Sequence, residues 1–187
     1  MNVQSATTPP FRAEHIGSLV RPAKLLAARK EHEDGKIDAA ALRAAEDEAI
    51  REVVAMQEAA GLLVVTDGEY RRSTYSDSFT TGGIRGVSVQ MTENEGWKNS
   101  QQFGHRMARR IPRVMERITW AANQNARDVD FLCSVTQRTA KFTMPGPGYI
   151  HYRAGRANID AGVYPTLDAF WADLVDELDT QSLFMSS

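Results

Sequence analysis

Polar residues that follow an apolar run are the first candidates for chemistry in this sequence. Residues 67–72 include two acids and two arginines and come directly after the apolar residues 62–66. If the apolar run is a strand of a parallel sheet, these polar residues lie at its carboxyl end, where α/β proteins carry their active sites. The Glu69 carboxylate can pair with an amine there. The alternative is a solvated loop acid, or one paired with Arg71 or Arg72.

A glycine turn near the amino terminus is the second candidate. Gly17 and Ser18 follow residues 12–16, which we expect to form a short strand. Glycine frees the backbone to turn and lets backbone groups approach a ligand carboxylate closely. The alternative is an ordinary turn that ends a strand.

Two helices are expected to separate these candidate segments. Residues 23–33 are rich in helix formers and are followed by the stop signal Asp34-Gly35. Asp38 is a suitable N-cap for the next helix, which Gly61 ends. Apolar residues recur along this helix at steps of three and four: Leu42, Ala45, Ala49, Val53, Met56 and Ala60.

Four core strands are expected in total. The first precedes the glycine turn, and the second, 62–66, is apolar enough to be buried on both faces. Residues 114–120 are the third, although 107–117 fit a helix equally well apart from Pro112. Residues 140–144 are the fourth.

The other segments are interpreted as helices and one insertion. Residues 126–138 are expected to be helical, and residues 75–104 to form an inserted β-hairpin or a long loop. A last amphipathic helix is capped by Thr166, and its apolar stripe contains Leu167, Phe170, Trp171, Leu174, Val175 and Leu178. Four strands alternating with helices make about half of a (β/α)8 barrel, which typically needs about 250 residues.

Composition excludes several classes of protein. The 187 residues carry 22 Lys and Arg against 24 Asp and Glu, and 42% are hydrophobic, as in an ordinary globular protein. The near-neutral charge argues against a nucleic-acid-binding protein, and no apolar run reaches the roughly 20 residues that span a membrane. With one cysteine and no signal-peptide pattern, the chain is expected to be cytoplasmic.

Three motifs stand in register along the chain: residues 12–22 (RAEHIGSLVRP), 65–72 (VTDGEYRR) and 138–147 (RTAKFTMPGP). Together they resemble the amino-terminal half of the cobalamin-independent methionine synthase catalytic-domain family, over residues 11–178. The resemblance implies a TIM-type barrel of which this chain forms about half. We expect residues 1–10 to be a flexible arm and residues 179–187 an irregular tail.

The resemblance also implies roles for individual residues. Ile16, Gly17 and Ser18 are expected to hold an amino-acid substrate through backbone and hydroxyl contacts, and Glu69 to accept a hydrogen bond from its ammonium group. His15, beside the turn, is assigned to the same substrate site, with a packed histidine as the alternative. No catalytic residue is assigned.

The family's zinc ligands are missing from this sequence. They are a His-x-Cys motif, a Glu and a further Cys, all from the second half of the barrel. Here Phe131 stands two residues before Cys133, the single cysteine, and the four histidines are widely scattered. We expect no metal site in this chain, and Cys133 to be a buried, inert thiol.

The implied function is transfer of a methyl group from a methylated folate to the thiol of homocysteine, incomplete in this chain because zinc activates that thiol in the family. The alternative is a non-catalytic truncated barrel that binds an amino acid weakly or associates with another chain through open sheet edges. Such association includes self-association.

Arginines between positions 106 and 117 are expected to form a solvated basic face, with a folate tail or nucleic acid as the alternative ligand: Arg106, Arg109, Arg110, Arg113 and Arg117.

Overall fold

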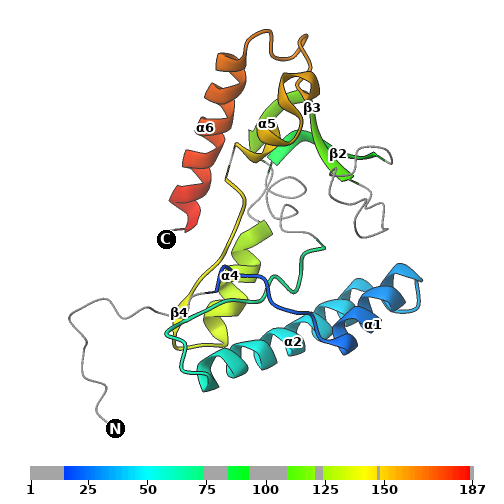
Figure 1. The fold of residues 1–187 in the computed structure, drawn as a ribbon, viewed down its shortest axis with the longest axis vertical. Helices are drawn as coiled ribbons and strands as arrows, with labels where there is room; N and C mark the ends of the chain where they lie inside the picture. Colours follow the sequence, from blue (N-terminus) through cyan, green and yellow to red (C-terminus); the bar gives the residue numbers. More distant parts are fainter. Residues whose placement is uncertain (1–14, 74–83, 93–108, 121–123, 147, 186–187) are drawn as a thin grey trace, which may run out of the picture.

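The computed structural model describes residues 15–73, 84–92, 109–120, 124–146 and 148–185. Its elements in chain order are α1 (Ala23–Glu33), α2 (Ala39–Ala59), β1 (Val64–Val65), β2 (Ile84–Thr92), β3 (Arg109–Trp120), α4 (Gln124–Ser134), β4 (Thr139–Ala140), α5 (Tyr149–Ala154), η2 (Gly155–Asn158) and α6 (Leu167–Met185). Figure 1 shows them in two groups, which the segment after β4 joins. We call the group with α1, α2, α4, β1 and β4 the amino-terminal lobe, and the group with β2, β3, α5 and α6 the hairpin lobe. Each lobe has its own cluster of buried apolar residues.

The first two helices confirm the expectation from local sequence. α1 has the predicted bounds, and Gly35 follows it with a φ of +71°. α2 begins after Asp38, whose carboxylate accepts a hydrogen bond from the Ala41 amide at 2.8 Å. Gly61, with a φ of +82°, lies just after the helix and allows the chain to turn into β1.

The buried face of α2 matches the predicted one at Ala49 and Val53 and differs from it at other positions. The buried residues of this helix are Glu46, Ala49, Ile50, Val53, Val54 and Gln57, whereas Met56 is 55% exposed. Gln57 is buried because its side-chain amide donates to the carbonyls of Val53 and Thr66 and accepts from the Thr66 amide. A hydrophobicity pattern excludes such a glutamine from the core, because it does not register hydrogen-bonding partners.

One pair of parallel strands forms the sheet of the amino-terminal lobe. Val64 lies opposite Thr139 and Val65 opposite Ala140, so the predicted second and fourth strands are neighbours, each with two paired residues. Val65 is fully buried, but Val64 is 36% exposed and Leu63 is 58% exposed. The prediction of a strand buried on both faces is therefore wrong, because the described elements cover this pair mainly on one side.

The second sheet corrects the prediction of four core strands that alternate with helices. β2 lies in the expected insertion and pairs with β3 in antiparallel register, from Ile84 opposite Trp120 to Thr92 opposite Arg109. Residues 114–120 are thus the returning strand of a hairpin and not a helix or a strand between helices, although Val114 and Ile118 are buried in the cluster of the hairpin lobe. Gly86, with a φ of +84°, sits at a register shift that bends the hairpin. The expected first strand is absent at residues 15 and 16, and residues 11–14 lie outside the described part.

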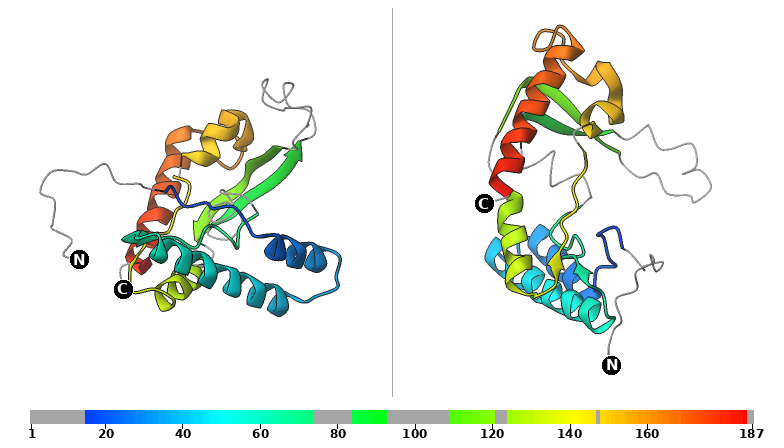
Figure 2. Two further views of the ribbon diagram at one scale, coloured as in Figure 1. Left: turned by 60° about the horizontal axis from the view of Figure 1, so that its bottom comes forward. Right: turned by 90° about the vertical axis from the view of Figure 1, so that its left-hand side faces the viewer.

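α6 packs on β3 and completes the hairpin lobe (Figure 2). The fully buried Tyr164 lies edge-on to Phe170, and its hydroxyl accepts from the Ile118 amide and donates to Asp173, both at 2.7 Å. Burial and the bond to Asp173 raise the pKa of Tyr164 to about 12. Val175, predicted on the buried stripe, is 50% exposed.

Two helix ends and one side chain also differ from expectation. α4 ends at Ser134, four residues before the predicted end, and α6 continues through Met185, where we expected an irregular tail after 178. Cys133 is exposed, not buried. Its neighbour Leu132 occupies the core, and a helical step of about 100° turns the next side chain outward.

The expected arm of residues 1–10 lies outside the described part. None of the helices in that part combines the length and apolar character needed to cross a bilayer.

Candidate functional site

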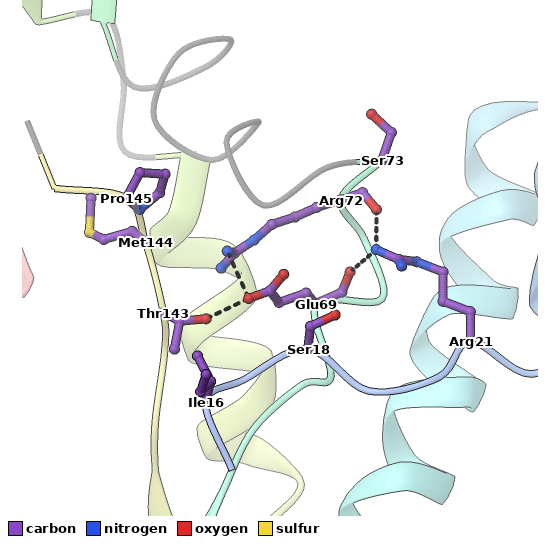
Figure 3. Close-up of a pocket in the computed structure, with 9 residues that line it drawn as sticks. All are labelled: Ile16, Ser18, Arg21, Glu69, Arg72, Ser73, Thr143, Met144 and Pro145. Atoms are coloured by element: carbon purple, nitrogen blue, oxygen red, sulfur yellow. Dashed lines mark hydrogen bonds and ion pairs between the residues drawn. The ribbon is translucent and has the colours of Figure 1, made fainter. Parts of the chain in front are cut away.

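A cavity of about 530 Å³ lies at the carboxyl ends of β1 and β4. Three segments line it, one from each of the three sequence motifs (Figure 3). The lining residues are Ile16, Ser18, Arg21, Glu69, Arg72, Ser73, Thr143, Met144 and Pro145. The carboxyl ends of parallel strands are where α/β folds bind ligands, so this cavity is the candidate site.

The turn after β1 positions Glu69. Gly68 and Glu69 have φ values of +67° and +58°, and Glu69 is the one non-glycine residue of the described part with a positive φ. The Asp67 carboxylate holds this turn by accepting from the Glu69 amide at 2.9 Å, and burial raises the pKa of Asp67. A left-handed non-glycine residue costs about 1–3 kcal/mol, and such strain is concentrated at functional sites.

The glycine turn packs directly against the Glu69 turn. The Thr66 hydroxyl donates to the Gly17 carbonyl at 2.8 Å, and the Leu19 amide donates to the Gly68 carbonyl at 3.1 Å. A Cβ atom at Gly17 would lie 2.8 Å from Cγ2 of Thr143, closer than real contacts. Glycine is therefore needed here for close approach, and this approach brings the first and third motifs together.

The Glu69 carboxylate is 7% exposed and faces two neighbours in the cavity. It accepts a hydrogen bond from the Thr143 hydroxyl at 2.8 Å, and Nη1 of Arg72 lies 3.8 Å from the same oxygen. Of the two arginines named as alternative partners, Arg72 is the one beside it. Arg71 instead lies 2.6 Å from Asp47 and 3.0 Å from Asp128.

Of the other predicted site residues, two line the cavity and two do not. Ile16 and Ser18 line the cavity, and Gly17 is buried between them. His15 is not among the lining residues, because its ring nitrogen Nε2 lies 2.5 Å from the side-chain oxygen of Gln57 on α2. This position corresponds to the packed histidine that we considered as the alternative.

Arg21 was missed by reasoning from sequence. Its Nη2 donates to the carbonyls of Glu69 and Arg72 at 3.0 and 2.7 Å, and Arg29 also donates to the Arg72 carbonyl at 3.0 Å. These bonds fix the backbone of the turn that carries the cavity side chains. Arg21 and Thr143 both belong to motifs recognised in the sequence. The motifs therefore indicated the segments that line the cavity, but not these two side chains.

A charged network supports the turn from the side of α2 and α4. Arg71 is 5% exposed, lies over the Phe131 ring at 4.8 Å and pairs with Glu46 at 3.5 Å in addition to Asp47 and Asp128. Burial raises the pKa of both Glu46 and Asp128. Several partnered charges thus anchor the turn without entering the cavity.

Two arginines of the expected basic face are among the described side chains. Arg113 donates to Gln90, and Arg117 pairs with Asp173 at 2.7 Å, both at exposed positions. The other three side chains of the cluster lie outside the described part. Within that part, no three His, Cys, Asp or Glu side chains are grouped so that they can hold a metal ion.

Comparison with known proteins gives relatives in sequence and in structure. No family model matches the chain. The uncharacterized protein YxjH of Bacillus subtilis is 31% identical over 88% of this chain and 42% of its own length. A 5-methyltetrahydropteroyltriglutamate–homocysteine methyltransferase of Streptomyces coelicolor is 28% identical over 74% of this chain and 17% of its own length. The chain thus spans well under half the length of these relatives.

Among solved structures, a candidate vitamin-B12-independent methionine synthase from Listeria monocytogenes superimposes with a TM-score of 0.69 and 27% identity. The match covers 92% of this chain and 47% of the Listeria chain. The described elements therefore have their counterparts within about half of a larger α/β protein.

Proposed function

Because this chain belongs to the family of proteins related to cobalamin-independent methionine synthase, we propose that its cavity binds the amino-acid substrate of a methyltransferase, homocysteine. The observation that carries this proposal is the Glu69 carboxylate, which is buried in a cavity at the carboxyl ends of β1 and β4. Arg72 lies within ion-pair distance of this carboxylate, at 3.8 Å, but donates no hydrogen bond to it. The carboxylate therefore keeps acceptor capacity for a charged donor, and an ammonium group supplies one.

The proposed roles follow from position. Glu69 accepts a hydrogen bond from the substrate ammonium, and the Thr143 hydroxyl, 2.8 Å away, orients the carboxylate. Ser18 and the backbone around Gly17 line the same cavity and supply polar groups to the ligand. In this proposal, these residues bind and orient an amino acid.

The zinc that activates the homocysteine thiol in the family does not fit the described residues. A zinc site needs three or four closely placed His, Cys or carboxylate ligands, and none of the cavity residues is a His or Cys. Cys133 is exposed on α4. We therefore propose that this chain supplies the amino-acid half of the site, and that methyl transfer from a methylated folate requires ligands from other residues.

A second candidate function is association with another chain. Exposed apolar side chains lie on and beside β1: Leu63 is 58% and Val64 36% exposed. Unpaired strand edges readily add a further strand. A second copy or a complementing chain would cover these side chains, and this role does not need catalysis.

Calorimetric titration with L-homocysteine, after light scattering has established the oligomeric state, tests the first proposal. Saturable binding is expected without added zinc. Glu69→Gln removes a charged acceptor worth about 1.5–3 kcal/mol, so the affinity should fall roughly 10- to 150-fold. Glu31→Gln, at an exposed position of α1, is the matched control. Absence of binding by the folded wild-type chain would refute the proposal and favour association.

A further inference from the structure

Among the described residues that line the cavity, Arg72 is the arginine whose two terminal nitrogens are both buried and without a hydrogen-bond partner. Arg72 is 6% exposed, and its group lies over the Phe142 ring at 4.4 Å. Its terminal nitrogens Nη1 and Nη2 are both buried and have no hydrogen-bond partner in the described part of the chain. The nearest carboxylate oxygen, Oε1 of Glu69, lies 3.8 Å from Nη1, which is within ion-pair distance but too long for a hydrogen bond.

The neighbouring arginines differ in that their terminal nitrogens have partners, although Nε of Arg21 is also buried without one. Nη2 of Arg21 donates to two backbone carbonyls, and Arg29 donates to the carbonyls of Tyr70 and Arg72. Arg71 directs its terminal nitrogens to carboxylates. Burying a charged donor without an acceptor is costly, so the two unused nitrogens of Arg72 call for an acceptor that is not among the described side chains.

We propose that Arg72 binds a ligand carboxylate in this cavity, in addition to the polar groups of the glycine turn. A guanidinium group offers two parallel N–H donors, a geometry that matches the two oxygens of a carboxylate. Figure 3 shows the Arg72 side chain reaching across the cavity toward the Thr143–Pro145 segment, with its tip beside Glu69. A ligand in this cavity meets both the carboxylate and the guanidinium.

The surroundings hold Arg72 ready for such a ligand. Its carbonyl accepts from Arg21 and Arg29, and its amide donates to the Glu69 carbonyl at 3.2 Å, so the backbone is fixed. The Phe142 ring supports the guanidinium from one face. Little conformational entropy then remains to be lost on binding.

Two sources of the carboxylate fit this chemistry. In a zwitterionic amino acid, an ammonium and a carboxylate stand side by side, as Glu69 and Arg72 do with opposite charges; this source rests on the proposed function. The other source is a carboxylate of a glutamate-bearing folate, which does not need the Glu69 contact. The adjacent opposite charges favour the amino acid, and the experiment separates the two sources.

Calorimetry with four probes tests the assignment: L-homocysteine, 3-aminopropane-1-thiol, which is homocysteine without its carboxylate, 5-methyltetrahydrofolate, and the simple dicarboxylate glutarate. Each is titrated into the wild-type chain, Arg72→Met and Arg72→Lys. Arg138→Met is the control, because Arg138 is exposed and precedes β4, at the end opposite to the cavity. Thermal unfolding of each variant establishes that it is folded.

For an amino-acid carboxylate, Arg72→Met should weaken homocysteine binding about 10- to 100-fold. It should not weaken binding of 3-aminopropane-1-thiol, because this amine uses Glu69 and has no carboxylate for Arg72. Arg72→Lys keeps the positive charge but loses the two parallel N–H donors of the guanidinium group. It should therefore recover only part of the affinity for homocysteine. If the carboxylate comes from the folate, Arg72→Met should weaken the folate alone. Loss of glutarate binding in Arg72→Met would support the carboxylate site even if homocysteine does not bind.

Two results would overturn the inference. If a folded Arg72→Met chain binds homocysteine, folate and glutarate as tightly as wild type, Arg72 has no ligand role although the proposed function stands. If the wild-type chain binds none of the three carboxylate probes, both the inference and the proposed function fail.

Discussion

Replacement of Gly17 by alanine tests whether close approach of the glycine turn builds the cavity. The new Cβ would lie 2.8 Å from Cγ2 of Thr143 and 3.2 Å from Oε1 of Glu69, and it would also overlap the Thr143 hydroxyl oxygen. Both overlapping groups of Thr143 leave the same β-carbon. Rotation of this side chain therefore exchanges one clash for another or breaks the Thr143–Glu69 hydrogen bond.

The expected cost has two parts. Overpacking of a filled site costs about 1–3 kcal/mol, and loss of a hydrogen bond to a charged acceptor costs about 1.5–3 kcal/mol where no water replaces it. Because Thr143 can relieve the overlap only by giving up the hydrogen bond, the two costs are alternatives, and we expect about 1–3 kcal/mol in total. For a chain of this length, Tm falls by about 2–4 °C per kcal/mol.

Thermal unfolding and homocysteine calorimetry are the assays. Gly146→Ala is the matched control, because a Cβ at Gly146 meets nothing within 4 Å although the residue follows the cavity segment directly. It should leave Tm and binding nearly unchanged. Gly17→Ala should lower Tm and weaken homocysteine binding, because Glu69 loses its orienting hydroxyl.

The double variant Gly17→Ala/Thr143→Ala decides whether the reasoning is correct. Thr143→Ala removes both atoms that the new methyl group would meet, so the double variant should be at least as stable as Gly17→Ala alone. Strictly additive losses, or a Gly17→Ala chain as stable as Gly146→Ala, would show that the close approach does not occur.

Three other predictions concern the supports of the cavity and the two lobes. Arg71→Met removes the buried partner of Asp47 and Asp128, which keep only the more exposed Arg43 as an ion-pair partner, and should lower the free energy of unfolding by about 1–3 kcal/mol in urea titration; a loss below about 0.5 kcal/mol would contradict the role of this network. Because folding raises the pKa of Tyr164 to about 12, the unfolded chain loses this proton first, so stability should fall as pH rises from about 10 to 12, and Tyr164→Phe should remove that part of the pH dependence. Cys133 is exposed, so iodoacetamide should alkylate the native chain at a rate near that of a free thiol, measured by mass spectrometry, whereas strong protection would place it in the core.

Local features of the sequence predicted the helices of the amino-terminal lobe. The bounds of α1 and the start of α2 depend on Asp34, Gly35 and Asp38, whose effects act within one helical turn. The polar segment after 62–66 also lies at the carboxyl end of β1, as expected. In each case the deciding interactions join residues that are neighbours in the chain.

Interactions between distant residues decided the rest. The alternating residues 114–120 fit a core strand equally well, and only their antiparallel pairing with β2 makes them a hairpin strand. Burial of Gln57 and exposure of Cys133 likewise depend on what packs against each helix face.

The candidate site shows the same division. The motifs of the sequence predicted that Gly17, Ser18 and Glu69 belong to one substrate site. The contacts of Glu69 with Thr143 and of His15 with Gln57 on α2, and the two unpartnered nitrogens of Arg72, could be seen only in the folded chain. A side chain's partner depends on which segments fold against it, and such segments can be far apart in the chain, as with Lys141, which donates to the His15 carbonyl 126 residues away.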